Sequence, residues 1–212
     1  DIAQRLDDGG LVKADAFISL AKTYRPYPYV EEHENVRYAV EGFLFPDTYE
    51  INGEFDATRI MQMMAENFDR RLTKDMRDRA REMDLSIYEL VTLASLVEKE
   101  AYHEEDRPII AQIFLKRLRL GMPLQADPTV QYLLDAPKED LLYRDTEIAS
   151  PYNTYQNVGL PPGPIASPGT ASLNAVLHPA DTNYLYFVAD RNGNNYYATN
   201  YADHLDLVER VR

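Results

Sequence analysis

A single acidic residue within an apolar helical segment is the first candidate for chemistry in this sequence. Glu98 follows the apolar run 93–97. At about 100° per residue, Glu98 falls near the middle of an apolar stripe that begins at Ile87, whereas Glu100 points roughly to the opposite side. A buried carboxylate is costly unless it is paired, protonated or functional, and burial raises its pKa toward the value that a general acid needs. The pattern indicates a general acid at Glu98, with a satisfied ion pair at the edge of the core as the alternative.

Polar residues from two later segments are candidates to converge on Glu98. They are Gln125, Asp127, Asn153, Thr154 and Tyr155. Tyrosine rings stack on sugars and side-chain amides bind hydroxyl groups, so these residue types favour a carbohydrate ligand. Two of them also have structural interpretations. Asp127 precedes Pro128 as a helix N-cap would, and Asn153 could hydrogen-bond its own loop.

The composition excludes several kinds of site. The 212 residues include 35 acidic and 22 basic side chains, a net charge of −13, which argues against a nucleic-acid partner and against electrostatic binding to an anionic membrane. The absence of cysteine excludes thiolate chemistry, and the four histidines are not spaced as zinc ligands. We find no phosphate-binding loop, dinucleotide fingerprint or Ser-His-Asp order. The sequence therefore predicts no metal and no cofactor, and a single carboxyl group remains as the candidate.

The N-terminal part of the chain, residues 1–55, is expected to form a small unit. Helices are predicted over 2–7 and 13–22, separated by a Gly-Gly stop. Extended segments are predicted over 36–40 and 42–51.

From residue 56 the pattern is mainly helical. Helices are expected over 56–72, 74–83, 106–121, 167–178 and 201–212. Two more are expected to begin at the Ser86/Glu89 capping box and at Asp127-Pro128. Asn192-Gly193 predicts a hairpin between 184–189 and 195–199. The irregular stretch 136–169 is long enough to indicate a functional loop. The fold class that follows is α+β, a mostly helical core with small β elements at each end.

The same residues resemble the YceG-like family. The resemblance is carried by five blocks in the family's order: 41–49 (EGFLFPDTY), 93–100 (LASLVEKE), 124–130 (LQADPTV), 152–155 (YNTY) and 159–165 (GLPPGPI). It covers nearly the whole chain. Ala126 departs from the pattern, where a small hydroxyl residue is expected. The resemblance implies a LysM-like subdomain, partial here, in residues 1–55 and a catalytic domain in residues 56–212.

The resemblance also implies an activity. Members cleave peptidoglycan glycan strands internally, between N-acetylmuramic acid and N-acetylglucosamine, and leave 1,6-anhydro-muramyl ends. The family's catalytic glutamate falls on Glu98, which would act first as acid and then as base. Gln125, Asn153 and Tyr155 would hold acetamido and hydroxyl groups, with Thr154 beside them, and Asp127 would orient Glu98 or its loop.

The implied cellular setting is the extracytoplasmic side of the bacterial cytoplasmic membrane. Members carry one N-terminal membrane anchor, which this chain lacks, and are linked to peptidoglycan synthases and other cell-wall elongation proteins that make and terminate new strands. Two other functions stay open. One is a non-catalytic peptidoglycan-binding or scaffold module, and the other is a simple hydrolase with Asp127 as second carboxylate.

Overall fold

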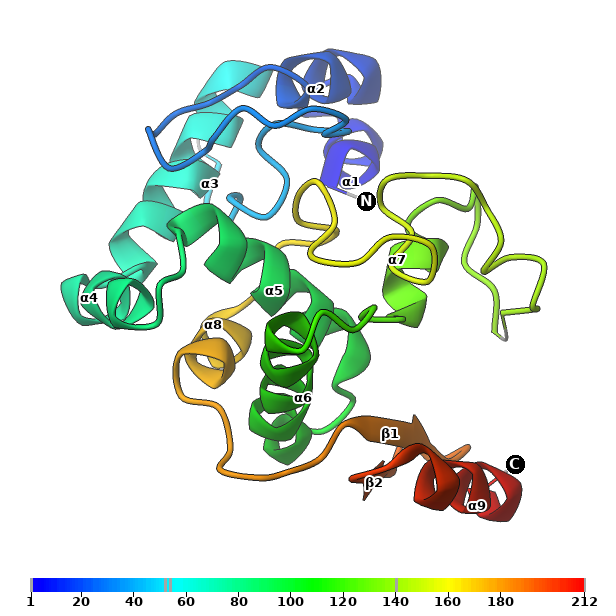
Figure 1. Cartoon of the computed structure of the whole chain (residues 1–212). Helices are drawn as coiled ribbons and strands as arrows, with labels where there is room; N and C mark the ends of the chain where they lie inside the picture. The colour runs from blue at the N-terminus through cyan, green and yellow to red at the C-terminus, as the bar shows by residue number, and fades with distance from the viewer. Residues whose placement is uncertain (1, 52, 54, 140, 212) are drawn as a thin grey trace.

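The chain folds as a predominantly helical α+β protein in a computed structural model that describes residues 2–51, 53, 55–139 and 141–211 (Figure 1). The helices are α1 (Ile2–Asp8), α2 (Ala14–Ala21), α3 (Ala57–Arg71), α4 (Lys74–Glu82), α5 (Ile87–Glu100), the 3₁₀ turn η1 (Glu104–Asp106), α6 (Arg107–Arg119), α7 (Asp127–Gln131), α8 (Thr170–Leu177) and α9 (Tyr201–Val211). Two short strands, β1 (Tyr186–Ala189) and β2 (Asn195–Ala198), pair antiparallel. The α+β fold class is confirmed.

Helix α5 lies at the centre of the core. Its predicted start is confirmed, because Ser86 accepts the Glu89 N–H at 3.1 Å and the Glu89 carboxylate accepts the Ser86 N–H at 2.8 Å. Every residue from Leu90 to Val97 is buried, since α4, α6, α7 and α8 all contact this helix (Figure 1). Hydrophobic periodicity identifies a buried face only when the opposite face is solvated. The stripe that seemed to contain Glu98 is therefore not a reliable guide to the direction of its side chain.

The N-terminal helices share their hydrophobic core with the rest of the molecule. Helix α2 packs against both α1 and α3, and one cluster of buried residues extends from Ala3 to Leu177. The predicted boundary between residues 55 and 56 and the LysM-like character of the first segment therefore remain predictions.

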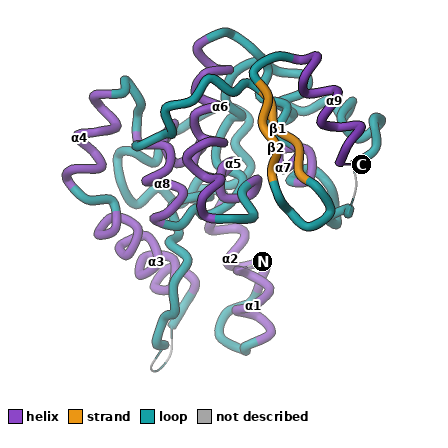
Figure 2. Tube along the Cα trace, turned by 90° about the horizontal axis from the view of Figure 1, so that it is seen from below, coloured by secondary structure: helices purple, strands orange, loops and turns teal. Residues whose placement is uncertain are grey.

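Segments 36–40 and 42–51 form turns and irregular chain, so the predicted β element at this end is wrong. Their backbone groups bind helices instead: the Val40 N–H donates to the Ala21 carbonyl at the end of α2 and the Phe45 N–H to the Met64 carbonyl within α3, each at 3.3 Å. A strand needs a neighbouring strand to complete its hydrogen bonds. In the part of the chain that the structure describes, β1 and β2 form the only sheet (Figure 2).

The β1–β2 hairpin and α9 form the opposite end of the molecule from α1 and α2 (Figure 1). Gly193 occupies the predicted turn with φ of 82°, in the left-handed region that glycine tolerates. Asp106, predicted as the cap of α6, makes no side-chain cap. Its carboxylate instead accepts the Asn195 amide at 2.8 Å and the Tyr197 hydroxyl at 2.5 Å, which ties the hairpin to the start of α6.

Candidate active site

The last turn of α5 carries two glutamates, Glu98 and Glu100, on different sides of the helix. Two residues correspond to about 200° of rotation around a helix axis. The two carboxyl groups therefore face different elements, and their surroundings differ in charge and in hydrogen bonding.

Glu98 faces the start of α8. Its Oε2 accepts the Gly169 N–H at 3.2 Å and the Ser172 hydroxyl at 2.6 Å. Its Oε1 lies 3.9 Å from Nη2 of Arg107, and Nε of Arg107 donates to Ser172 Oγ at 3.2 Å. The side chain is 30% exposed, so the expectation that Glu98 is buried within an apolar stripe is wrong. All of its contacts are donors or cations, and they join the end of α5 to α8.

Glu100 faces α6 and α7. Burial raises the pKa of its carboxyl group to about 8, and the negative charge of Asp127 contributes to the increase; Arg117 and the backbone N–H of Asp127 act in the opposite direction. A carboxyl group with this pKa is mostly protonated at neutral pH, which a general acid requires. Helical periodicity in the sequence predicts that Glu100 points away from the core. The structure corrects this, because α7 packs against the end of α5.

Gln125 and Asp127 are exposed at the start of α7. Gln125 has φ of 50°, a left-handed conformation that costs a non-glycine residue about 1–3 kcal/mol, and its N–H donates to the Thr154 carbonyl at 3.1 Å. Ala126, not Asp127, is the N-cap of α7. The predicted capping role of Asp127 is therefore wrong. Its carboxylate accepts the Tyr155 hydroxyl instead, so Asp127 and Tyr155 stand together beside Glu100.

Asn153 and Thr154 lie beneath this surface, 0% and 1% exposed. The Thr154 hydroxyl accepts the Ala126 N–H at 2.9 Å and lies 2.9 Å from the Thr129 hydroxyl. The Asn153 amide donates to two carbonyls of its own loop at 3.0 and 2.8 Å. The sequence grouped both residues with those that contact substrate. Their geometry fits a different task, because they hold the 125–127 segment and the loop that carries Tyr155 in position.

Arg117 belongs to the surroundings of Glu100 and was missed in the sequence. It is buried, and it donates to the Leu124 carbonyl at 2.6 Å and to the Leu185 carbonyl at 2.8 Å. Burial lowers the pKa of Arg117, and the negative charge of Glu100 is one of the effects that oppose this. In the sequence it resembles one of several basic residues at a helix C-terminus. Its spacing of three from Phe114, on the apolar face of α6, is the signal that could have identified it.

Ser172 and Arg107, the partners of Glu98, were also missed. Ser172 is fully buried within α8, and nothing in the local sequence connects it to a residue 74 positions earlier. Within the described ranges there is no group of His, Asp or Glu side chains that could hold a metal ion. No helix among those residues is long and apolar enough to cross a membrane.

The chain belongs to the YceG-like family, whose model matches residues 1–210. The resemblance seen in the sequence is thus confirmed over nearly the full chain.

Three relatives illustrate the similarity. The chain is 38% identical over 212 residues to an endolytic murein transglycosylase of Bacillus subtilis, covering 99% of the chain and 57% of that protein. It is 37% identical over 204 residues to an endolytic murein transglycosylase of Streptococcus pneumoniae, covering 91% of the chain and 36% of that protein. A crystal structure of a yceG-like protein from Listeria monocytogenes matches with a TM-score of 0.89 and 34% identity, covering 97% of the chain and 71% of that structure. The chain thus spans little more than half the length of the B. subtilis relative and about a third of the S. pneumoniae relative.

Proposed function

We propose that this chain is the catalytic part of an endolytic peptidoglycan lytic transglycosylase. The observation that carries the proposal is the Glu100 carboxyl group, which burial and the neighbouring charge of Asp127 keep protonated at neutral pH. The curated relatives at 37–38% identity, which are named endolytic murein transglycosylases, support it. The target bond is the β-1,4 bond from N-acetylmuramic acid to N-acetylglucosamine within a glycan strand.

In the proposed reaction one carboxyl group serves twice. Protonated Glu100 gives its proton to the glycosidic oxygen as the bond from C1 of muramic acid to that oxygen breaks. The C6 hydroxyl oxygen of the same muramic acid then forms a bond to C1, and the resulting Glu100 carboxylate accepts the proton of that hydroxyl. The products are a 1,6-anhydro-muramyl end and a new N-acetylglucosamine hydroxyl, and Glu100 is again protonated. Water takes no part, so no second catalytic carboxylate is needed.

The neighbouring residues have separate roles in this proposal. Exposed Gln125 binds acetamido or hydroxyl groups, and the Tyr155 ring forms a wall against a sugar. The negative charge of Asp127 adds to the effect of burial in raising the pKa of Glu100. The alternative assignment of the acid to Glu98, which the sequence favoured, stays a prediction. It is less well supported because Glu98 is already engaged by Ser172 and Gly169.

One observation favours a second candidate function, a glycoside hydrolase. Asp127 is close enough to Glu100 to raise its pKa and does not cap α7. Ordinary glycosidases use such a pair of carboxyl groups, one as acid and the other as base or nucleophile. In that case Asp127 would activate water, and cleavage would leave reducing ends.

The products of digestion distinguish these functions. Purified glycan strands are incubated with the wild type and with Glu100→Gln, and the fragments are identified by mass. The expected result is anhydro-muramyl ends from the wild type, formed about 10²–10⁴-fold more slowly by Glu100→Gln. Reducing ends would identify a hydrolase. Binding to the strands without any product would indicate a non-catalytic peptidoglycan-binding or scaffold module.

We also propose a cellular setting, which the family resemblance supports. The complete protein would be anchored in the bacterial cytoplasmic membrane by one N-terminal segment. Its catalytic part would lie on the extracytoplasmic side, where it would end nascent strands beside peptidoglycan synthases. Protease added to spheroplasts should then digest this domain. A domain protected from protease until lysis would contradict the proposed location.

A further inference from the structure

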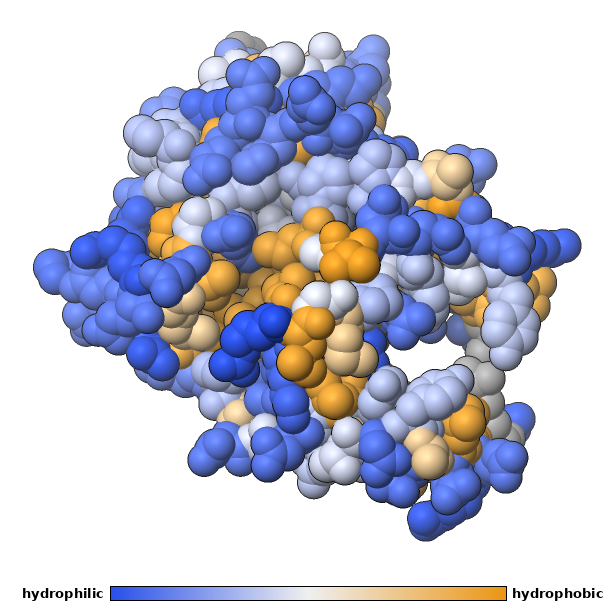
Figure 3. Space-filling model, in the orientation of Figure 1, coloured by the Kyte–Doolittle hydropathy of each residue, from blue (hydrophilic) through white to orange (hydrophobic). Residues whose placement is uncertain are grey.

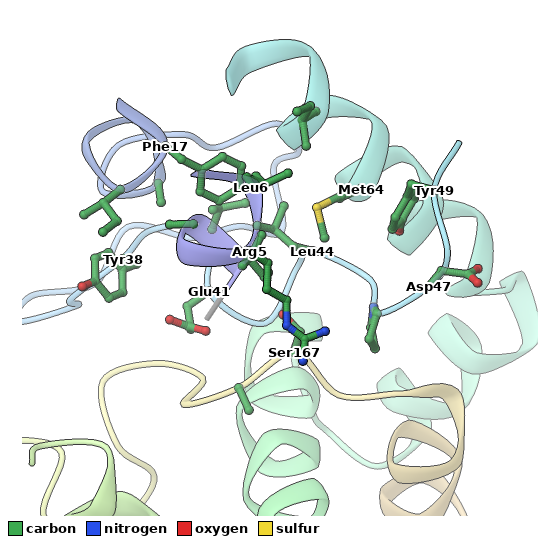
Figure 4. Close-up of a pocket in the computed structure, with 18 of the residues that line it drawn as sticks. Arg5, Leu6, Phe17, Tyr38, Glu41, Leu44, Asp47, Tyr49, Met64 and Ser167 are labelled. Atoms are coloured by element: carbon green, nitrogen blue, oxygen red, sulfur yellow. The ribbon is translucent and has the colours of Figure 1, made fainter. Parts of the chain in front are cut away.

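A cavity of about 560 Å³ lies between the N-terminal helices and the end of α5 (Figure 4). This volume is within the range of small-molecule binding sites. Its wall is mainly apolar and includes Leu6 and Phe17 from α1 and α2, Leu44 from the following loop, and Met64 from α3. The opposite wall is formed by Lys99 and by residues 165–167. Residues from both predicted units, 1–55 and 56–212, therefore line the cavity.

The cavity wall carries two cationic side chains that pair with neither of its two acids. Arg5 and Lys99 both line it, and neither side chain forms a hydrogen bond or ion pair with another described residue. Figure 4 shows Arg5 extending toward Ser167. Asp47 pairs with Arg71 at 2.8 Å. Glu41 accepts the Tyr132 hydroxyl at 3.3 Å, and burial raises its pKa and so disfavours its negative charge.

This charge contrasts with the remainder of the molecule. The chain has a net charge of −13, and on the face shown in Figure 3 hydrophilic residues surround a central hydrophobic area. Two cations with no partner among the described residues, next to an apolar wall, are complementary to a ligand that carries carboxylates and small alkyl groups.

The cavity and the proposed active site share the last turn of α5, which contributes Lys99 to one and Glu100 to the other. Lys99 lies between Glu98 and Glu100 in the sequence, about 100° around the helix from each. On the opposite wall, Ser167 is two residues before Gly169, whose N–H binds Glu98. A glycan strand at Glu100 would therefore have substituents of its muramic acid within reach of this cavity.

We infer that the cavity binds the peptide stem of the muramic acid residue next to the cleaved bond. The stem is a short peptide with alanyl methyl groups and free carboxylates, and the glycan strand itself brings it to the site. Its methyl groups contact the apolar wall, while Arg5 and Lys99 pair with its carboxylates. The inference rests on the proposed function, because only a peptidoglycan strand supplies such a stem.

The test compares strands that carry stems with the same strands after an amidase has removed them. The wild type should cleave the stem-bearing strands with a kcat/KM about tenfold higher, and Arg5→Gln and Lys99→Gln should each remove most of this preference through KM. Cleavage of the bare strands should be unchanged in both variants. Arg191→Gln, in the distant β1–β2 turn, also removes one positive charge, and it should leave kcat/KM unchanged on both substrates. Equal kcat/KM on both substrates for the wild type, or equal losses in the variants, would overturn the inference.

A binding measurement separates this inference from the proposed reaction. N-acetylmuramyl tripeptide is titrated into the wild type, Arg5→Gln and Arg191→Gln by calorimetry, with N-acetylmuramic acid as the stem-free ligand. Tighter binding of the tripeptide that is lost only in Arg5→Gln supports the stem site even if no strand is cleaved. Cleavage without any such difference in binding refutes the stem site and leaves the proposed function intact.

Discussion

The two sides of the last turn of α5 place a glutamate in opposite environments. On the α8 side, Glu98 receives a backbone N–H and a hydroxyl, with a guanidinium 3.9 Å away. On the α7 side, Glu100 is partly exposed, and loss of hydration together with the negative charge of Asp127 raises its pKa to about 8. The first environment favours a carboxylate that links two helices, and the second favours a carboxyl group that can give up a proton.

This difference shows how one helix turn can hold a protonated carboxyl group, Glu100, next to a carboxylate, Glu98, that links two helices. The contacts of Glu98 with α8 immobilise the end of α5, and the orientation of Glu100 depends on that end. General acid catalysis requires both the correct protonation state and a geometry held within a fraction of an ångström. The two glutamates divide these requirements, so substitutions on the two sides should have unequal effects.

The largest effect is expected from removal of the proton donor. Glu100→Gln keeps the shape and the hydrogen-bonding capacity of the side chain but cannot transfer a proton, so anhydro-product formation should fall by about 10²–10⁴-fold. Glu98→Gln should reduce the rate by about tenfold or less, because it disturbs position only. Initial rates on glycan strands, read by mass analysis of the products, provide the comparison.

Thermal unfolding of both variants is the control for this pair. Glu100→Gln should be at least as stable as the wild type at pH 8, because the neutral amide avoids burying a charge. The assignment fails if Glu98→Gln is the inactive variant and Glu100→Gln retains most of its rate.

Local patterns in the sequence predicted most of the helices but not the surroundings of Glu98 and Glu100. The Ser86/Glu89 capping box and the Asn192-Gly193 turn were recognisable because each depends on residues close together in the chain. The direction of Glu98 depends on Ser172, 74 positions later. Tertiary packing around α5 buries all of its faces, which removes the periodic signal that the prediction used.

The same limit applies to the loop residues. The structure brings Gln125, Asp127 and Tyr155 together at the start of α7, and their contact with substrate stays a prediction. Asn153 and Thr154 are adjacent to them in sequence but turn inward, where they complete backbone hydrogen bonds. Residue type alone cannot distinguish a sugar-binding side chain from one that supports the backbone, because the same amide or hydroxyl can hydrogen-bond either partner.

The next largest effect concerns the charge beside Glu100. Asp127→Asn removes a negative charge that raises the pKa of Glu100 but keeps an acceptor for the Tyr155 hydroxyl. The pKa of Glu100 should fall, so the alkaline limb of the pH–rate profile should move to lower pH, with a loss of about tenfold at pH 8 and little change at pH 5. Asp127→Glu, which keeps the charge, is the matched control. An equal loss at every pH would instead favour Asp127 as a catalytic base of a hydrolase.

A smaller effect is expected from the support beneath the 125–127 segment. Thr154→Val has nearly the same shape but leaves the buried Ala126 N–H without its acceptor, at a cost of about 1–3 kcal/mol in the free energy of unfolding. The start of α7 should shift relative to Glu100, and the rate should fall by about fivefold. Chemical denaturation and initial rates measure the two effects. Thr154→Ser, which restores the hydroxyl, should recover most of both; a Ser variant as impaired as Val would show that packing of the methyl group is what matters.

The smallest effect is expected on the anchoring side. Ser172→Ala removes the 2.6 Å hydrogen bond to Glu98 but leaves the Gly169 N–H in place, so the free energy of unfolding should fall by about 1 kcal/mol. Because Glu100 and its neighbours are untouched, the rate should stay within about twofold of the wild type. A double-mutant cycle with Glu98→Gln should give a coupling energy in stability and almost none in rate. A loss of activity in Ser172→Ala as large as that in Glu100→Gln would reverse the roles of the two sides, since it would mean that the proton is delivered from the α8 side.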